Sequence, residues 1–308
     1  MKKKVSIIGG GNVGASAAQL IAHDGIADVV LFDIAEGMPQ GKALDMAEAC
    51  PLWNSSVSVK GTNSYRDTEK SDVIVITAGI PRKPGMSRDD LLKTNAEVVK
   101  SVAAETSKLS PEAVVIVVTN PMDVMAFVAC KTSGSDHHKV FGMGGVLDSA
   151  RFRTFISLEL GVSPVDVEAL VMGGHGDQMV PMPRYTTIKG VPITKMLPAE
   201  KVASLIERTR NGGAEIVSLL KTGSAYYAPA AATCQMIRAI LFDEKRILPC
   251  AVYLEGQYGV RDIYVGVPAV LGARGIEKVI ELELNEEERA DFDRSVSAVK
   301  ALMEKITL

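Results

Sequence analysis

The sequence lacks paired cysteines, an excess of positive charge and long apolar runs. Its four cysteines are far apart in the 308 residues and form no C-x-x-C pair: Cys50, Cys130, Cys234 and Cys250. Scattered thiols of this kind favour free cysteines in a reducing cytosol over a disulfide framework or a zinc site. We therefore expect a cytoplasmic protein. No cluster of metal ligands stands out either, so we expect no bound metal.

The charge balance and the short apolar runs argue against two classes of partner. The 34 Lys and Arg residues against 37 Asp and Glu give a formal net charge of -3. Binding to nucleic acid or to an anionic membrane needs concentrated positive charge, so we expect neither. The longest apolar run, 113–118, is far shorter than the roughly 18 residues of a membrane span. The apolar segment 5–8 is too short for a signal peptide, and no targeting segment is expected.

The first half of the chain alternates short apolar runs with helix-length segments. The apolar runs are rich in Val and Ile and lie at 5–8, 29–32, 73–76 and 114–118. The helix-length segments between them lie at 13–23, 41–48 and 91–109. Continuous apolar strands are typical of a parallel sheet covered on both faces. The alternation therefore predicts an α/β fold with a doubly wound parallel sheet.

The second half predicts an α+β arrangement instead. A helix is expected at 147–160, a strand at 167–172 and a hairpin around Gly190-Val191-Pro192. Long helices follow at 199–220 and 225–242, and Asn285 with Glu288 three residues later predicts the start of a final helix. The pattern changes near residues 142–145, so we predict a first domain over 1–143 and a second over 144–308.

A glycine-rich turn follows the first strand directly. In Gly9-Gly10-Gly11-Asn12-Val13-Gly14, three glycines satisfy G-x-G-x-x-G and allow a tight turn, close approach to a pyrophosphate and packing of the next helix. Asp33 ends the second strand, where its carboxylate can bind an adenosine ribose and repel a 2′-phosphate. No basic residue follows before Lys42, which we interpret as a solvated helix residue. The pattern predicts a Rossmann-type NAD site; the alternative is a glycine turn with a surface aspartate.

His175 is the histidine whose surroundings best suit chemistry. It lies in Gly173-Gly174-His175-Gly176-Asp177, where flanking glycines let a ligand approach the ring. Asp148 and Arg151 are three residues apart, so both project from one helix face. They could form a local ion pair worth a few tenths of a kcal/mol. Alternatively, Asp148 turns toward His175 and Arg151 toward a substrate anion. The sequence leaves both open.

Four motifs in order resemble the malate/lactate dehydrogenase family, most closely its lactate-dehydrogenase-like malate dehydrogenases. They are the glycine turn at 9–14, Val-Thr-Asn-Pro at 118–121, Leu-Asp-Ser-Ala-Arg at 147–151 and Gly-Gly-His-Gly-Asp at 173–177. The resemblance runs from about Lys3 to the final helix. It implies a homodimer or homotetramer, although the long helices could equally be packed within one chain.

The resemblance assigns a role to each matching residue. His175 would donate and accept the proton, Asp148 would orient it, and Arg151 would hold the C1 carboxylate of a 2-hydroxy acid through two hydrogen bonds. Asn120 would bond the substrate oxygen. The cofactor contacts implied are residues 9–14, Asp33, Asn95 and the segment Val118, Thr119 and Asn120.

The segment 78–88 resembles the mobile lid of this family. Arg88 would polarise the C2 carbonyl, and Arg82 would meet the second carboxylate of malate or oxaloacetate, where lactate dehydrogenases typically have Gln. The resemblance thus implies an NAD-dependent malate dehydrogenase. The alternatives are a lactate dehydrogenase and a non-catalytic NAD-binding module; for the lid arginines alone, the alternative is a solvated basic loop.

Overall fold

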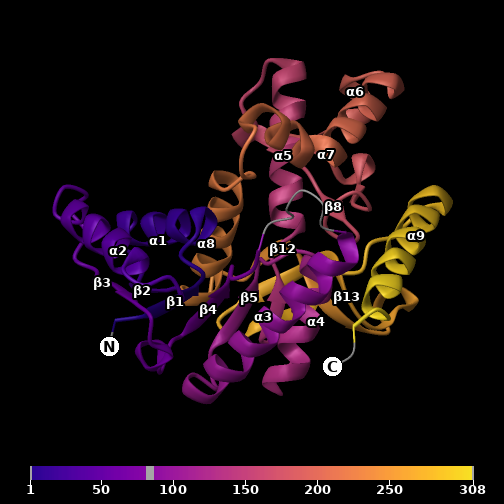
Figure 1. Ribbon diagram of the computed structural model, residues 1–308. Coiled ribbons are helices and arrows are strands. Elements are labelled where there is room, and N and C mark those ends of the chain that lie inside the picture. Colours follow the sequence, from indigo (N-terminus) through magenta and orange to yellow (C-terminus); the bar gives the residue numbers. More distant parts are fainter. Residues whose placement is uncertain (1, 81–86, 307–308) are drawn as a thin grey trace.

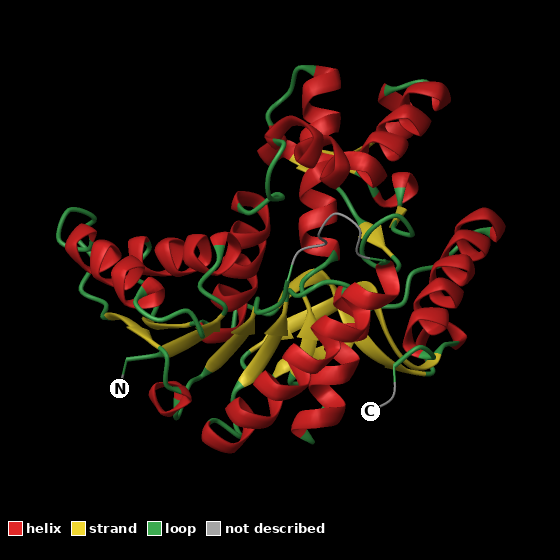
Figure 2. Ribbon diagram, viewed as in Figure 1, coloured by secondary structure: helices red, strands yellow, loops and turns green. Residues whose placement is uncertain are grey.

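The fold is built on one nine-stranded sheet, seen in the computed structural model as a central layer with helices on both sides (Figures 1 and 2). The structure describes residues 2–80 and 87–306, and only the backbone of residue 88. In these ranges no helix is long and apolar enough to cross a membrane.

Six strands of the sheet are parallel, in the order β3-β2-β1-β4-β5-β6. They are β1 (Lys4–Ile8), β2 (Asp28–Phe32), β3 (Val59–Thr62), β4 (Val73–Ile76), β5 (Val114–Val117) and β6 (Val140–Gly142). All four side chains of β4 are buried, which is typical of a strand covered on both faces. The predicted α/β fold with a doubly wound parallel sheet is confirmed.

Helices cover both faces of the parallel strands (Figure 1). On one face α1 (Asn12–His23) and α2 (Met38–Ala49) lie near α8 (Tyr227–Leu241), and α1 packs against α8. On the other face α3 (Arg88–Leu109) packs against α4 (Met122–Ser133). Two of these helices begin three residues earlier than predicted: α2 has Pro39 in its first turn, and α3 is capped by Ser87 and Asp90 in a capping box.

Three antiparallel strands, two of them long, extend the same sheet beyond β6. They are β12 (Arg246–Glu255), β13 (Arg261–Gly272) and β14 (Gly275–Val279). The link between the two parts is narrow, because β12 and β6 share only the pair Ala251–Gly142. The sequence pattern predicted none of these strands, and they join the second half of the chain to the sheet of the first.

The remaining elements form a smaller layer beside α5 (Gly145–Leu160) and α7 (Ala199–Leu220). They are β7 (Val167–Glu168), β8 (Val171–Met172), β9 (Val180–Pro181), β10 (Thr187–Ile188), β11 (Val191–Pro192), α6 (Ile193–Met196) and the 3-10 turns Pro164–Asp166 and Pro183–Tyr185. Two other 3-10 turns lie elsewhere: Tyr65–Thr68 follows β3 and packs against α3, and Gln257–Gly259 connects β12 to β13. A separate apolar cluster around Phe152 and Ile156 holds this layer together.

The predictions for this second half hold in part. The hairpin appears as β10 and β11. The helix α9 (Glu286–Met303) is capped by Asn285, whose side chain accepts a hydrogen bond from the Glu288 N–H at 2.8 Å. The single strand expected at 167–172 is wrong. It divides into β7, which pairs with β10, and β8, which pairs with β9, because the chain changes partner between the two.

Candidate active site

The glycine turn closes tightly against the end of β4. A Cβ atom on Gly14 would lie 1.9 Å from the Gly9 carbonyl oxygen, so no side chain fits there. Gly9 itself has φ 115°, which favours glycine. Gly11 is the N-cap residue of α1; no side chain caps the helix there, and a Cβ added to Gly11 would have no atom within 4 Å. The first N–H groups of α1 are therefore open to an anion.

Asp33 is anchored to this turn. Its Oδ2 accepts a hydrogen bond from the Gly10 N–H at 2.6 Å, and its Oδ1 accepts one from the Ala35 N–H at 3.0 Å. The interpretation of Lys42 as a merely solvated residue is wrong, because its ammonium donates to the Gly10 carbonyl oxygen at 2.7 Å. Both side chains thus help to hold the glycine turn in place.

A chain of contacts along the carboxyl edge of the sheet leads from the glycine turn to Asn120. Thr77, after β4, donates to the Gly9 carbonyl at 2.9 Å, and Thr119, after β5, donates to the Ala78 carbonyl at 2.7 Å. Ligands of open α/β sheets bind at this edge, where the strand order reverses between β1 and β4.

Asn95 joins the two loops next to Asn120. The Asn95 side chain is 2% exposed; its oxygen accepts from the Ile80 N–H at 2.9 Å, and its amide donates to the Asn120 carbonyl at 2.8 Å. Through these hydrogen bonds the side-chain amide of Asn95 holds the loop after β4 and the loop after β5 together. Val118 and Thr119 lie on the same edge, directly after β5.

His175, Asp148 and Arg151 form one buried hydrogen-bonded chain. The Nδ1 atom of His175 lies 2.8 Å from Oδ2 of Asp148, and Nη1 of Arg151 donates to Oδ1 of the same carboxylate at 3.2 Å. The Asp148 side chain is 2% exposed, that of His175 12% and that of Arg151 14%. Both contacts that the sequence left open are therefore present together.

This environment changes the pKa of His175. Burial alone lowers it, but the charge and hydrogen bond of Asp148, helped by the charge of Asp123, outweigh burial, so the net pKa is raised. Arg151 retains an unused donor, since its Nε is buried and has no hydrogen-bond partner in the described part of the chain. A buried guanidinium with a free N–H is suited to an anion.

Two features of this arrangement were not predicted from the sequence. The helix α7 carries Gly212 and Gly213 beside the Arg151 side chain, and a Cβ on Gly212 would lie 3.2 Å from Arg151 Cδ. Adjacent glycines within a helix are the available sequence signal, because they weaken a helix unless something packs closely against it.

The second such feature is Asp123, in the first turn of α4. This carboxyl is 5% exposed, and its Oδ2 accepts a hydrogen bond from the His175 backbone N–H at 2.8 Å. Burial raises the pKa of Asp123 to about 7. A single acidic residue in the apolar stretch 122–129 is the signal that could have found it.

A pocket of about 550 Å³ opens beside His175. His175, Asn120 and Asp123 are among its polar groups, and Leu91 of α3 with Leu302 of α9 contributes to an apolar wall. The fold thus brings Asn120 and His175 into one pocket, and Asp148 and Arg151 adjoin it through His175. Arg82 lies outside the described residues, as does the side chain of Arg88, the first residue of α3.

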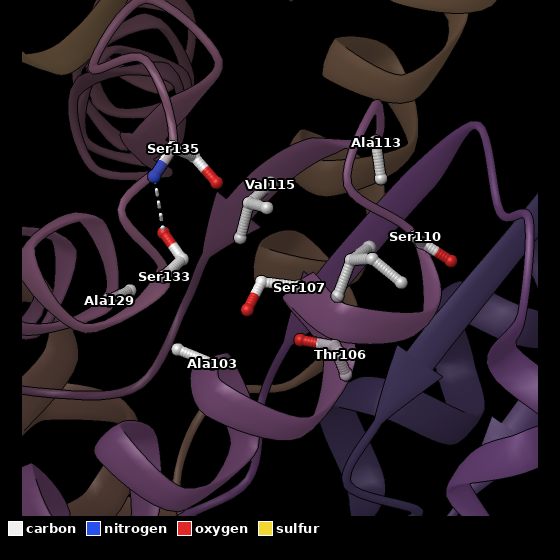
Figure 3. A pocket seen from close by; sticks show the side chains of 10 residues that line it. Ala103, Thr106, Ser107, Ser110, Ala113, Val115, Ala129, Ser133 and Ser135 are labelled. Atoms are coloured by element: carbon white, nitrogen blue, oxygen red, sulfur yellow. Dashed lines mark hydrogen bonds between the residues drawn. The ribbon is translucent and has the colours of Figure 1, made fainter.

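A second cavity lies between α3, α4 and β5 and is unsuited to catalysis (Figure 3). It has a volume of about 10 Å³ and is lined by small or apolar side chains such as Thr106, Ser107 and Ser133. That volume is at the lower limit for one water molecule. The chemistry of the described residues therefore points to the His175 pocket.

Comparisons with known proteins agree with this arrangement. The family model described as "lactate/malate dehydrogenase, NAD binding domain" matches residues 3–142, and the model described as "lactate/malate dehydrogenase, alpha/beta C-terminal domain" matches 145–307. The malate dehydrogenase of Desulforudis audaxviator (strain MP104C) is 60% identical over 307 residues, covering 100% of this chain and 99% of that protein.

Solved structures of two enzymes from Cryptosporidium parvum are also similar. Its malate dehydrogenase superimposes with a TM-score of 0.96 at 47% identity, covering 99% of this chain and 98% of that one. Its lactate dehydrogenase, complexed with lactic acid and nicotinamide adenine dinucleotide, gives a TM-score of 0.96 at 44% identity with the same coverages. The fold alone therefore does not separate the two substrates.

Proposed function

The chain belongs to the lactate/malate dehydrogenase family, and from that premise we propose that it is a malate dehydrogenase that interconverts (S)-malate and oxaloacetate with NAD. The observation that carries the proposal is the buried chain of Arg151, Asp148 and His175 beside the pocket. It combines an anion-binding group with a proton carrier of raised pKa, as a 2-hydroxy acid dehydrogenase needs.

The described residues fit NAD. The open N-terminus of α1 would hold the pyrophosphate, and the Asp33 carboxylate would bind the adenosine ribose. Gly14 and Gly9 leave no room for a side chain, so the backbone of the turn packs closely against the edge of the sheet at which NAD would bind. NAD held there would supply the hydride acceptor for malate oxidation and, as NADH, the hydride donor for oxaloacetate reduction.

The protein moves the proton. In malate oxidation, neutral His175 accepts the proton of the C2 hydroxyl at Nε2 while Asp148 holds Nδ1 and stabilises the imidazolium that forms. In oxaloacetate reduction the same ring must begin protonated, and its raised pKa favours that state. Arg151 would bind the C1 carboxylate, and Asn120 would donate to the C2 oxygen.

Substrate choice is proposed to depend on Arg82, with Arg88 polarising the C2 carbonyl. Under a closed lid, pyruvate's methyl group would leave Arg82 unpaired, and a site built for a polar substrate group can reject an analogue lacking it by about 10⁴–10⁵-fold. A lid arginine that stays hydrated would discriminate less. The alternative is a lactate dehydrogenase, because the structure is also similar to the lactate dehydrogenase of C. parvum.

We also propose a homodimer or homotetramer. Large apolar side chains are exposed on and after α2, with Leu44 62% and Leu52 86% exposed. A pocket of about 390 Å³ between α1 and α2 is lined in part by Trp53 and Tyr226. Apolar surface of this kind is typical of an interface between copies of a chain.

The decisive experiment follows the loss of NADH absorbance with oxaloacetate or pyruvate at equal concentration. Fast oxidation with oxaloacetate alone would support the proposal, and Arg82→Gln should then move the preference toward pyruvate. Preference of the unaltered protein for pyruvate would make it a lactate dehydrogenase. NADH binding without NADH oxidation by either oxaloacetate or pyruvate would favour a non-catalytic module.

A further inference from the structure

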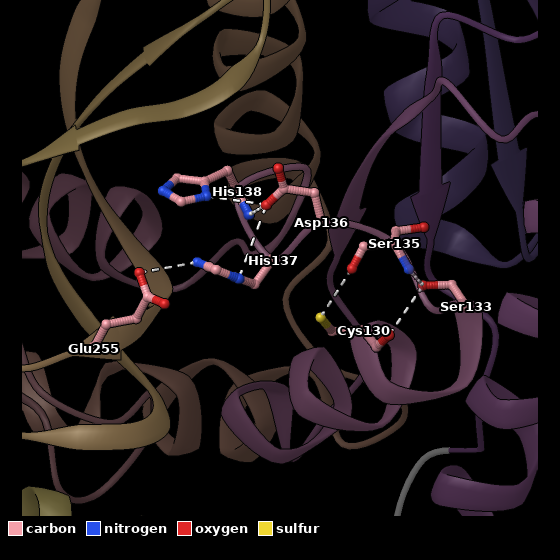
Figure 4. Close-up of polar contacts among 7 residues, drawn as sticks. All are labelled: Cys130, Ser133, Ser135, Asp136, His137, His138 and Glu255. Carbon is pink, nitrogen blue, oxygen red and sulfur yellow. Dashed lines mark hydrogen bonds and ion pairs between the residues drawn. The ribbon is translucent and has the colours of Figure 1, made fainter.

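The turn between α4 and β6 gathers three potential metal ligands. Asp136, His137 and His138 are consecutive, and one ligand atom from each lies within 4.8 Å of the other two. Oδ1 of Asp136 is 3.0 Å from Nδ1 of His138 and 3.9 Å from Nδ1 of His137. Figure 4 shows both rings turned toward this carboxylate. Ligands of a tetrahedral zinc ion lie about 3.4 Å apart, since each is about 2.1 Å from the metal, so only small side-chain movements are needed.

The backbone of the turn is held in place. The Lys139 N–H donates to the Asp136 carbonyl at 2.8 Å, and the His138 N–H donates to Oδ1 of Asp136 at 2.9 Å. The strand β6 begins at Val140, two residues after His138. The three side chains therefore project from a fixed turn, which lowers the entropy lost when they bind one ion.

A residue from a distant strand supports the cluster. Nε2 of His137 lies 3.2 Å from Oε2 of Glu255, the last residue of β12, at ion-pair distance though not aligned as a hydrogen bond (Figure 4). A small rotation of the His137 ring would align its Nε2 atom with the Glu255 carboxylate. The ring proton would then lie on Nε2, and the lone pair of Nδ1 would point toward Asp136, where it could bind the metal. Metal-binding histidines almost always have such a carboxylate on the other ring nitrogen.

We propose that Asp136, His137 and His138 bind a divalent transition-metal ion of the zinc or nickel type, with Glu255 orienting His137. Two imidazoles and one carboxylate select such ions over Mg²⁺ and Ca²⁺, which prefer oxygen ligands. The site lies at the amino end of β6, whereas Asn120 follows the carboxyl end of the parallel strand β5. The proposed ion is thus remote from the His175 pocket. This proposal departs from the sequence-based expectation of a protein without metal.

The test is calorimetric titration of the full chain with ZnCl2 and, separately, NiCl2. We expect His138→Ala to weaken binding of one ion by at least about tenfold, and Glu255→Gln to weaken it by about 10–100-fold although Glu255 is not a ligand. The matched control is Glu112→Gln, which removes an exposed carboxylate paired with neighbouring Lys139 and should change nothing.

Three results would overturn the proposal. The first is binding that His138→Ala leaves unchanged, and the second is Glu255→Gln binding as tightly as the unaltered chain. The third is loss of binding in Cys130→Ser, which would assign the ion to a thiol. Circular dichroism of each variant establishes that it is folded, and NADH oxidation should be the same with and without the metal.

A second, independent observation concerns Asp123, which carries half of its hydrogen-bonding capacity unused. Oδ2 accepts from the His175 N–H, but Oδ1 is buried and has no hydrogen-bond partner in the described ranges. Asp123 also lines the 550 Å³ pocket. A buried carboxyl without full hydrogen bonding is costly, so a functional reason for it is expected.

The contacts of His175 indicate that reason. The ring is held by Asp148 through Nδ1, while the backbone is held by Asp123; the adjacent Gly174 N–H donates to Ser295 Oγ at 2.8 Å. The charged groups around the ring are Asp148 and Arg151 from α5 and Asp123 from α4. Lys305, beyond α9, and Asp177 of the same loop line the pocket.

On the basis of the proposed dehydrogenase function, we infer that Asp123 is a positioning residue that fixes the His175 backbone and whose negative charge favours the imidazolium form. Asp123→Asn retains an oxygen that can accept the His175 N–H but removes the charge. Asp123→Ala removes both. The two effects can therefore be measured separately.

The primary readout is the pKa of His175, followed by NMR titration of its ring, which does not depend on activity. We expect Asp123→Asn to lower this pKa, and the matched control Ser295→Ala, which removes a neutral loop contact, to leave it unchanged. In oxaloacetate reduction, Asp123→Asn should change KM by less than about threefold and Asp123→Ala should lower kcat by about tenfold or more.

An unchanged His175 pKa in Asp123→Asn would overturn the inference, as would Asp123→Ala with the kcat of the unaltered protein. If the unaltered protein oxidises NADH with neither substrate, the proposed function fails instead. The NMR titration then still decides whether Asp123 acts on His175.

Discussion

The two halves of the candidate site are built in different ways. The cofactor half consists of backbone groups from one short segment, the turn at 9–14, together with Asp33 at the end of the next strand. The catalytic half consists of buried charged side chains from separate elements: His175 from the β8–β9 loop, Asp148 and Arg151 from α5, and Asp123 from α4.

This difference predicts how each half responds to mutation. Backbone N–H groups bind phosphates whatever side chains surround them, provided that the turn can form. Buried charges depend on their partners, because a charge left alone in the interior is strongly destabilised. Loss of a charge in the catalytic half should therefore affect chemistry more than binding, whereas a change in the cofactor half should affect folding or NADH binding.

The largest effect is expected for His175→Asn. Removing the proton carrier should lower kcat for NADH oxidation by oxaloacetate by about 10²–10⁴-fold, while NADH binding measured by fluorescence stays within a factor of about three. His23→Asn, which changes an exposed histidine, is the control. Turnover retained by His175→Asn would contradict the role given to this ring and remove the contrast between the halves.

Asp148→Asn should be the next most severe. We expect kcat to fall by about 10²-fold or more, since the ring loses its orienting charge. Because Asp148 raises the pKa of His175, its loss lowers that pKa. Oxaloacetate reduction needs protonated His175 and is lost as pH rises through this pKa, so in Asp148→Asn the loss should begin at lower pH. A loss of activity that begins at the same pH as in the unaltered protein would contradict this assignment.

Gly14→Ala tests the cofactor half by steric means. A Cβ 1.9 Å from the Gly9 carbonyl oxygen forces the turn open, and we expect a loss of about 1–3 kcal/mol of stability together with weakened NADH binding. Thermal unfolding and fluorescence titration measure the two. Gly11→Ala is the stability control, because the space around Gly11 is open. Equal thermal stability of the two variants would show that close packing at Gly14 does not matter.

Asp33→Ala should have the smallest effect. We expect NADH affinity to fall by about tenfold, in line with loss of a charge-assisted hydrogen bond, and discrimination against NADPH to decrease. Glu36→Ala changes an exposed carboxylate three residues away and serves as the control. NADPH binding that stays as weak as in the unaltered protein would show that Asp33 does not select the cofactor.

The same division separates what could be predicted from what could not. Four of the six parallel strands and the glycine turn were predictable because Val- and Ile-rich runs and glycine spacing report local preferences. The short strands β3 and β6 carry no such run and were not predicted. The strands β12 and β13 were missed. Their residues include Pro249 and Pro268, which face each other in the pairing and interrupt the usual strand signal.

Asp148 and Arg151 show the limit most clearly. Their spacing established that they share a helix face, but it could not tell an ion pair from a contact with His175. The structure contains both, because one carboxylate has two oxygens and each meets a different partner. The contact of Asp123 was not predicted, because no residue near it in the sequence indicates that its partner is His175.

Residue order was enough to predict the glycine turn, four of the six parallel strands, the final helix cap and the order of the family motifs. Each depends on backbone stereochemistry and side-chain spacing within a few residues. The folded chain was needed to establish which groups surround His175, whose contacts reach Asp148, 27 residues away, and Asp123, 52 residues away. Long-range packing brings these residues together, and burial then strengthens the electrostatic interactions that shift the His175 pKa.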